Sequence, residues 1–368
     1  MTNGNDIIHL LADAFGLPII DGKNHVWFFR TESGLYYYDF RFNNYIALGW
    51  DLIAPNLIND IQKDIDKKKS EISILYPDEK RPGLILGQME TFYNKMQKGD
   101  IIVIPSVGGK EVSIGVLGEI AVSITHTLSD NEYPICVYKH KRTVSWLKRV
   151  DLWTDVYFSK VLRAQQTISD ITEYAEMVYR NLHPCYISSK AIHLTMRKTT
   201  DTDYNITDNI MLQSSVIQIS KLLSEYFEIP IEQNSIKIKT AVGSPGFLEL
   251  IFPVLPVSAI AVACVFNAFV GKFKNEKGEM ASGIMAIISK GNDLLNDHVN
   301  RQKTKAEIEQ IKANTRKTEA ETAKIHDELS TQNSREMLLV EISDHCSEIK
   351  NAADNSGIKI ENQLKKIC

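Results

Sequence analysis

Short helical and strand patterns alternate along the first part of the chain. Apolar side chains recur at helical spacing in residues 7–16, which predicts a short amphipathic helix. Aromatic and β-branched residues dominate residues 25–50, and these residue types favour strands. The spacing becomes helical again in residues 86–96 and ends at a Lys-Gly-Asp step.

A glycine pair marks a hairpin after this helix. The strand-like segments IIVIPSV and EVSIGVLGE flank Gly108 and Gly109, and both glycines can take the positive φ that a tight turn needs. A further strand is predicted at 133–150. Several strands and two short helices predict a small barrel-like α+β domain at residues 1–165.

A second, smaller α/β pattern follows at residues 166–246. Helical spacing is found at 167–182 and 210–227, and strand patterns are found at 191–198 and 236–242. We expect a separate middle α/β unit that leads into an apolar segment.

A long uncharged segment follows the middle unit. It contains 22 residues without a charge, from Leu250 to Gly271. A membrane-spanning helix needs about 20 such residues. Lys272 and Lys274 follow directly and suit anchors whose charged ends reach the membrane surface. We therefore expect residues 247–274 to form a transmembrane helix that associates the protein with the inner membrane.

Three features oppose a simple span. Pro253 and Pro256 disrupt its first turns, and Glu249 shortens its upstream margin. Lysines on both sides give no orientation by the positive-inside rule. The alternative is a buried helical hairpin within a soluble oligomer.

The tail at residues 275–368 is rich in charged residues. Apolar and threonine positions between Ile308 and Leu329 follow an alternating spacing of three and four residues, which is typical of a heptad seam. A coiled coil and a homo-oligomer are expected, with a single solvated helix as the alternative.

Composition narrows the class of protein. The 368 residues suggest two or three domains, and 43% hydrophobic with 24% charged residues is near the globular norm. A net charge of -4 excludes an overall basic protein but allows local basic patches. The five scattered cysteines form no CxxC pair, so we expect no disulfide framework and no metal. VGGKE lacks the spacing and the Lys-Ser/Thr ending of a P-loop, and we expect no cofactor. Asp6 and Asp13 argue against a signal peptide, so the N-terminal domain should be cytoplasmic.

Two tryptophans are the strongest candidates for a binding site. Trp50 and Trp146 lie in separate predicted strands of the first domain. Two indoles can form a cage that stacks on a flat base. The alternative is that both are core residues.

Polar residues near the tryptophans could complete such a site. Lys139, Lys141 and Arg142 could meet phosphate, and Asp51 or Ser106 could hydrogen-bond the edge of a base. The alternative is that the basic run is a solvated face.

An ordered set of short motifs carries a resemblance to a known family. IALGWDLI, FYNKMQKGDIIVIPSVGGKEVSIGVLGE, HKRTVSWL and AQQTISDI resemble the PUA-like/EVE-like N-terminal domain of Mrr-type restriction proteins, over roughly residues 20–170. Such domains are associated with modified bases or nucleotide-like ligands held in an aromatic pocket. The resemblance implies that Trp50, Trp146 and Arg142 line the pocket, together with Asp51 and Ser106.

The second half departs from Mrr proteins. We find no acidic pair followed by a Glu/Gln-x-Lys arrangement, which a metal-dependent nuclease needs. IKIKTAVGSPGFLELIFP and NAADNSGIKI instead resemble a module of bacterial conflict-system proteins. We expect an α+β protein with a PUA-like small β-barrel, a middle α/β unit, a transmembrane helix and a coiled-coil tail.

The main functional hypothesis is a non-enzymatic sensor-effector of antiphage defence. It would bind a modified nucleobase or nucleotide in its N-terminal domain and act through the membrane helix. The alternatives are a soluble DNA-binding specificity subunit that recruits a separate nuclease, and a purely structural oligomer.

Overall fold

In the computed structural model the chain forms two compact units. One unit, Gly22–Leu182, is inserted between the two segments of the other, Met1–Asp21 and His183–Cys368. We call them the inserted unit and the flanking unit. The structure describes residues 4–58, 64–125, 133–152, 155–164, 166–198, 206–232, 235–241, 246–270, 284, 286–296, 324–355 and 358–359.

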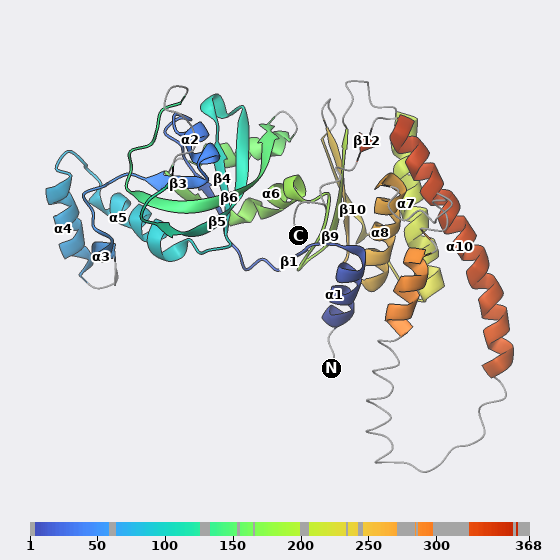
Figure 1. The fold of residues 1–368 in the computed structure, drawn as a ribbon. Coiled ribbons are helices and arrows are strands. Elements are labelled where there is room, and N and C mark those ends of the chain that lie inside the picture. Colours follow the sequence, from blue (N-terminus) through green and yellow to red (C-terminus); the bar gives the residue numbers. More distant parts are fainter. Residues whose placement is uncertain are drawn as a thin grey trace, which may run out of the picture. The chain divides into compact units, whose positions relative to one another are not determined.

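The inserted unit is built on one six-stranded sheet with the order β3-β6-β5-β4-β2-β7 (Figure 1). The pair β2 and β4 is parallel, and the other neighbours are antiparallel. Its elements are β2 (Val26–Phe29), α2 (Tyr37–Phe42), β3 (Tyr45–Leu48), α3 (Pro55–Ile58), α4 (Ile65–Leu75), α5 (Pro82–Glu90), a π-helical turn (Thr91–Lys95), β4 (Ile101–Pro105), β5 (Glu111–Ala121), β6 (His140–Asp151), β7 (Ile168–Asp170) and α6 (Ala175–Leu182), with 3-10 turns at Val107–Gly109, Val156–Arg163 and Thr172–Tyr174.

Two glycines allow β5 and β6 to bend. The register between these strands shifts at Gly115 and again before Ile120. An added Cβ would lie 2.6 Å from Val144 at Gly115 and 2.1 Å from Thr143 at Gly118, so the close backbone approach requires glycine at both positions. The described strands form a curved, open half-barrel with edges β3 and β7, so the expectation of an α+β fold with a small β-barrel is wrong.

Local predictions for this unit had mixed outcomes. The hairpin glycines Gly108 and Gly109 have φ of 69° and 64°, as predicted. Residues 37–42 form helix α2 rather than a strand, because one helical face buries Tyr37 and Phe40. Packing here overrides the strand preference of aromatic residues.

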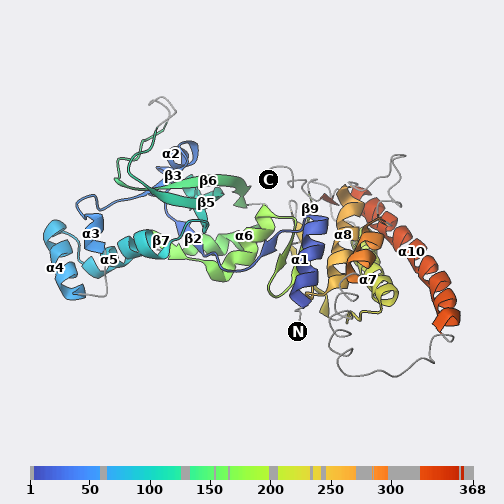
Figure 2. The ribbon, with the colours of Figure 1, turned by 60° about the horizontal axis from the view of Figure 1, so that its bottom comes forward.

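The flanking unit has a second sheet, with the order β1-β8-β9-β11-β10 and with β12 paired to β9. Helices α1, α7, α8 and α10 lie on one side of this sheet (Figures 1 and 2). Its elements are α1 (Gly4–Phe15), β1 (Ile19–Ile20), β8 (Cys185–Ser188), β9 (Ile192–Lys198), α7 (Ile206–Phe227), β10 (Lys237–Ala241), β11 (Phe247–Phe252), α8 (Pro256–Val270), α10 (Lys324–Asn355) and β12 (Ile358–Lys359).

The apolar segment is a core element of this unit. Its first residues form β11, between β9 and β10, and α8 is a helix of 15 residues. Helices α1, α7 and α10 and strand β9 all pack on α8. Gly291 also approaches it so closely that an added Cβ would lie 2.7 Å from Ile260. Burial by protein on all these sides explains the absence of charge.

The expectation of a transmembrane helix is therefore wrong. Among the described residues, no helix has both the length and the apolar character needed to cross a membrane. The residues expected to form a middle unit and a tail pack together with the apolar segment. Strands β8, β9 and β10 share one sheet with β11, and α10 packs on α7 and α8. Most of the expected seam, from Ile308 to residue 323, lies outside the described residues.

The face of this sheet opposite the helices carries a buried ion pair. Leu194 and Leu250 belong to the core under the helices, so their chain neighbours His193 and Glu249 point to the other face. The Nδ1 atom of His193 lies 2.9 Å from a Glu249 carboxylate oxygen, and the two side chains are 1% and 0% exposed. Glu249, which shortens the apolar run, is thus a buried partner of β9.

We predict that Glu249→Leu lowers the free energy of unfolding by about 1–3 kcal/mol, because it leaves the His193 ring without its acceptor in a buried site. Glu249→Gln should recover most of the loss, since an amide oxygen still accepts from Nδ1–H. Urea unfolding followed by circular dichroism measures both. Equal stability of Glu249→Leu and wild type would show that the pair does not stabilise the sheet.

Candidate functional site

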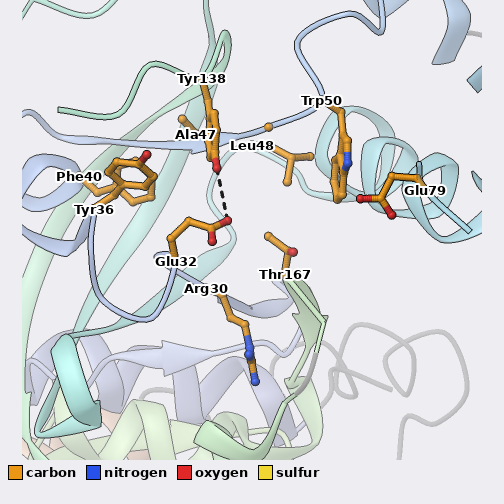
Figure 3. Close-up of a pocket in the computed structure, with 11 residues that line it drawn as sticks. Arg30, Glu32, Tyr36, Phe40, Ala47, Leu48, Trp50, Glu79, Tyr138 and Thr167 are labelled. Carbon is orange, nitrogen blue, oxygen red and sulfur yellow. Dashed lines mark hydrogen bonds between the residues drawn. The ribbon is translucent and has the colours of Figure 1, made fainter. Parts of the chain in front are cut away.

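The inserted unit contains a cavity of about 260 Å³ beside the end of β3 (Figure 3). This volume is just below the usual range for small-molecule sites, about 300–1,000 Å³. Its walls come from the segment after β2, helix α2, the end of β3 and the segment before β6. The lining residues are Arg30, Glu32, Tyr36, Phe40, Ala47, Leu48, Gly49, Trp50, Glu79, Tyr138 and Thr167.

Aromatic rings form much of the wall. Tyr36 packs edge-on against Tyr138, with 5.6 Å between ring centroids and 74° between planes. Tyr36 also contacts Phe40 of α2 at 6.0 Å. Trp50 lies on the other side of Leu48 from Tyr138 (Figure 3). A flat ligand that enters this cavity meets aromatic surface on more than one side.

The backbone of Trp50 is held in an unusual conformation. Its φ of 66° is left-handed, which is uncommon for a bulky residue and costs about 1–3 kcal/mol. Its carbonyl accepts a hydrogen bond from His140 Nε2, at 3.1 Å. The other ring nitrogen, Nδ1, is hydrogen-bonded to the Tyr93 hydroxyl, at 2.6 Å. Two partly buried hydrogen bonds thus hold the Trp50 backbone at the cavity.

The residues after Trp50 are fixed by two further hydrogen bonds. A carboxylate oxygen of Asp51 accepts from the Lys139 backbone N–H at 2.7 Å. The Leu52 N–H donates to the Tyr76 hydroxyl at 2.9 Å. The first bond joins the end of β3 to the segment that carries Tyr138, so it connects two walls of the cavity.

A second left-handed segment lies in the wall after β2. Glu32, Ser33 and Gly34 have φ of 50°, 56° and 95°. The Gly34 N–H closes the turn by donating to the Thr31 carbonyl at 3.1 Å. Two of the cavity-lining residues, Glu32 and Trp50, are therefore non-glycine residues held in a strained conformation, and such residues cluster at functional sites.

The charged lining residues are two carboxylates and one guanidinium. Glu32 and Glu79 are exposed, and the side chain of Glu79 lies next to the Trp50 indole (Figure 3). Arg30 donates from Nε and Nη2 to the Ala164 carbonyl, at 3.1 and 2.8 Å. The lining is thus more acidic than basic.

Tyr138 is a hydrogen-bond donor within this wall. Its hydroxyl lies 3.4 Å from a Glu32 carboxylate oxygen, which accepts from it. Burial, and then the negative charge of Glu32, raise the pKa of Tyr138 to about 12. The phenol therefore stays neutral at physiological pH and keeps its proton for Glu32.

Asp39 on α2 ties the walls together. Its buried carboxylate accepts from the Tyr45 hydroxyl on β3 and from the Cys136 N–H at 2.7 Å. It also accepts from the Asn43 amide at 2.8 Å, at the end of its own helix. One side chain thus joins α2, β3 and the segment before β6.

Of the residues predicted for the site, Trp50 lines the cavity and Asp51 is its chain neighbour. The carboxylate of Asp51 binds backbone, which is a structural role. Trp146 does not line the cavity. Its indole N–H donates to the Phe40 carbonyl at 3.0 Å, so it supports α2 from outside the cavity.

Arg142 is a buried clamp rather than a lining residue. It is 3% exposed, and it donates to the carbonyls of Phe92, Met96 and Gly118 at 2.7–2.9 Å. Burial lowers its pKa from the usual value. The guanidinium therefore joins the end of the π-helical turn to the β5 bulge.

The remaining predicted residues lie outside the lining. The Ser106 hydroxyl accepts from the Glu111 N–H at 3.1 Å and closes the β4–β5 hairpin. Lys141 lies over the Tyr45 ring, with its ammonium 5.1 Å from the centroid. Lys139 is exposed, and its chain neighbour Tyr138 lines the cavity.

Sequence reasoning missed Tyr36, Phe40, Tyr138 and Glu32. The three aromatic residues lie in motifs rich in aromatic residues, where nothing separates a cavity wall from a core position. The left-handed φ of Glu32 has no sequence signal, because glutamate seldom adopts it. Among the described residues, no group of three or more His, Cys, Asp or Glu side chains could hold a metal ion.

We predict that Arg142→Met lowers the free energy of unfolding by about 1.5–3 kcal/mol or more, because three backbone carbonyls lose a charged donor. Lys139→Met is the matched control, and its exposed side chain should change stability by less than about 0.5 kcal/mol. Urea unfolding followed by tryptophan fluorescence distinguishes them. Unchanged stability of Arg142→Met would contradict the clamp.

A family model described as Domain of unknown function (DUF8426) matches residues 30–172. This range is less than half of the chain, and it contains every residue that lines the cavity. No curated protein matches the chain, and no solved structure matches it.

Proposed function

We propose that the inserted unit binds a flat nitrogen heterocycle, a modified nucleobase or nucleotide, in the cavity beside β3. One observation carries the proposal: Trp50 and Glu32 both have a left-handed backbone, and both line a cavity that has aromatic walls. An indole presented in this way is suited to stacking, because each base offers a π-face. The resemblance to the PUA-like/EVE-like domain supports the same ligand class.

The polar groups around the rings can fix the orientation of a base. Glu32 is an acceptor for ring or amino N–H groups, and Thr167 lies on the same side of the cavity (Figure 3). A small number of polar groups that fix the orientation of the ligand is the usual arrangement of a ligand pocket.

The lining set favours binding over catalysis. It contains no serine, cysteine or histidine as a nucleophile, and Glu32, one of its two carboxylates, accepts a hydrogen bond from the Tyr138 hydroxyl. The role of the whole chain as a sensor in antiphage defence is a proposal that rests on the sequence resemblance alone. A membrane helix has no part in it.

We predict that Trp50→Ala weakens nucleoside binding about tenfold or more, since loss of one stacking contact costs about 1–3 kcal/mol. Trp146→Phe should bind within about twofold of wild type, because its ring lies outside the cavity. Calorimetric titration with a panel of methylated nucleosides measures both. A panel without any binder, or equal losses in the two variants, would contradict the proposal.

A second candidate, recognition of the base within DNA, is favoured by one observation. Lys139 is exposed beside the cavity-lining Tyr138, where it could reach a phosphate that flanks a bound base. This is the alternative of a soluble DNA-binding specificity subunit.

We predict for this alternative that an oligonucleotide with one modified base binds more tightly than its nucleoside. Its affinity should fall as salt rises, and Lys139→Ala should reduce the log–log salt slope by about one. Fluorescence anisotropy across a salt series gives the slope. Equal affinity for nucleoside and oligonucleotide, independent of salt, would leave the free nucleotide as ligand.

A further inference from the structure

The charges around the cavity restrict the ligand further, if the proposed function holds. The charged lining groups are the carboxylates of Glu32 and Glu79 and the guanidinium of Arg30. The guanidinium already donates two hydrogen bonds to the Ala164 carbonyl. The lining is therefore poorly suited to a phosphate group. The two carboxylates would repel it, and the one guanidinium is already bound to a backbone carbonyl. A neutral or positively charged ligand group fits the cavity better than a negatively charged one.

The aromatic wall strengthens this preference. The face of each ring carries partial negative charge, so a cation over Trp or Tyr is stabilised. Trp50, Tyr36 and Tyr138 supply such rings around one cavity. Rings and carboxylates thus attract the same kind of ligand.

Glu32 is also prepared to accept hydrogen bonds from a ligand. An ionised carboxylate has about four acceptor sites, so the bond from the Tyr138 hydroxyl leaves acceptor capacity. Because the phenol is neutral and donates, it keeps the carboxylate oriented toward the cavity. The matching ligand edge carries N–H donors.

We propose that the cavity selects a base that carries a delocalised positive charge, namely an N-alkylated purine or pyrimidine cation. Such a base is flat, so it stacks on Trp50, and its charge is stabilised by the rings and by Glu32 and Glu79. Alkylation at a ring nitrogen that carries no proton, such as N1 of adenine or N3 of cytosine, generates this charge, whereas methylation at carbon or at an exocyclic amine leaves the base neutral.

Isomeric methylated nucleosides test the charge alone. Calorimetry at neutral pH compares 1-methyladenosine with N6-methyladenosine, and 3-methylcytidine with 5-methylcytidine. Each pair has the same methyl group count, and only the first member is a cation. Wild-type protein should bind each cation at least tenfold more tightly than its neutral isomer.

Carboxylate variants show whether the named residues cause the preference. Glu32→Gln keeps an acceptor for Tyr138 and removes the charge, so it should reduce the preference for cations at least threefold while binding of the neutral isomers stays within twofold. Glu119→Gln is the control, because its exposed side chain pairs with Lys98 and does not line the cavity.

The outcomes separate the two proposals. Equal or tighter binding of the neutral isomers overturns the inference about charge and leaves the proposed function standing. Cation preference that survives in the double variant Glu32→Gln/Glu79→Gln also overturns it, since the charge would then be recognised elsewhere. If no nucleoside of either kind binds, both proposals fail.

Discussion

The buried carboxylate of Asp39 is the interaction on which the candidate site depends. It accepts from β3 through Tyr45, from the segment before β6 through Cys136, and from the end of its own helix through Asn43. Hydrogen bonds to a charged acceptor are roughly twice as strong as neutral ones. Trp50 and Tyr138 lie two residues beyond the last pair of β3 and β6, Leu48 and His140. Helix α2, whose first residue follows Tyr36, is not part of that sheet, so the carboxylate fixes it to both strands.

Rigid walls matter because a small ligand has few contacts to offer. Ordering loops and side chains on binding costs affinity, and a wall that is already ordered avoids that cost. Two hydrogen bonds order the Trp50 wall when the unit folds. One runs from His140 to the Trp50 carbonyl, and the other from the Lys139 N–H to Asp51. The strain at Trp50 is therefore offset by the stability of the unit and not by ligand binding.

Sequence patterns predicted those elements whose cause is local. The turn at Gly108 and Gly109 and the strand β9 follow from residue types and their spacing. The apolar run was misread because absence of charge indicates burial without saying whether lipid or protein covers the residues. Its cover comes from α1, α7 and α10, which are remote in sequence. The cavity was only partly foreseen for the same reason, since Tyr36 and Tyr138 are separated by 102 positions (138 − 36).

The insertion of one unit into the other has a consequence for how the chain folds as it is made. Strand β1 cannot pair with β8 until the whole inserted unit has been synthesised. The first and last strands of that unit, β2 and β7, are neighbours in its sheet, and only α6 and a 3-10 turn follow β7 within the unit. Once folded, it therefore acts as a short connection and removes most of the entropy cost of closing a long loop. The inserted unit should thus fold first during synthesis. Helix α1 can pack on α8 only after the last third of the chain has been made.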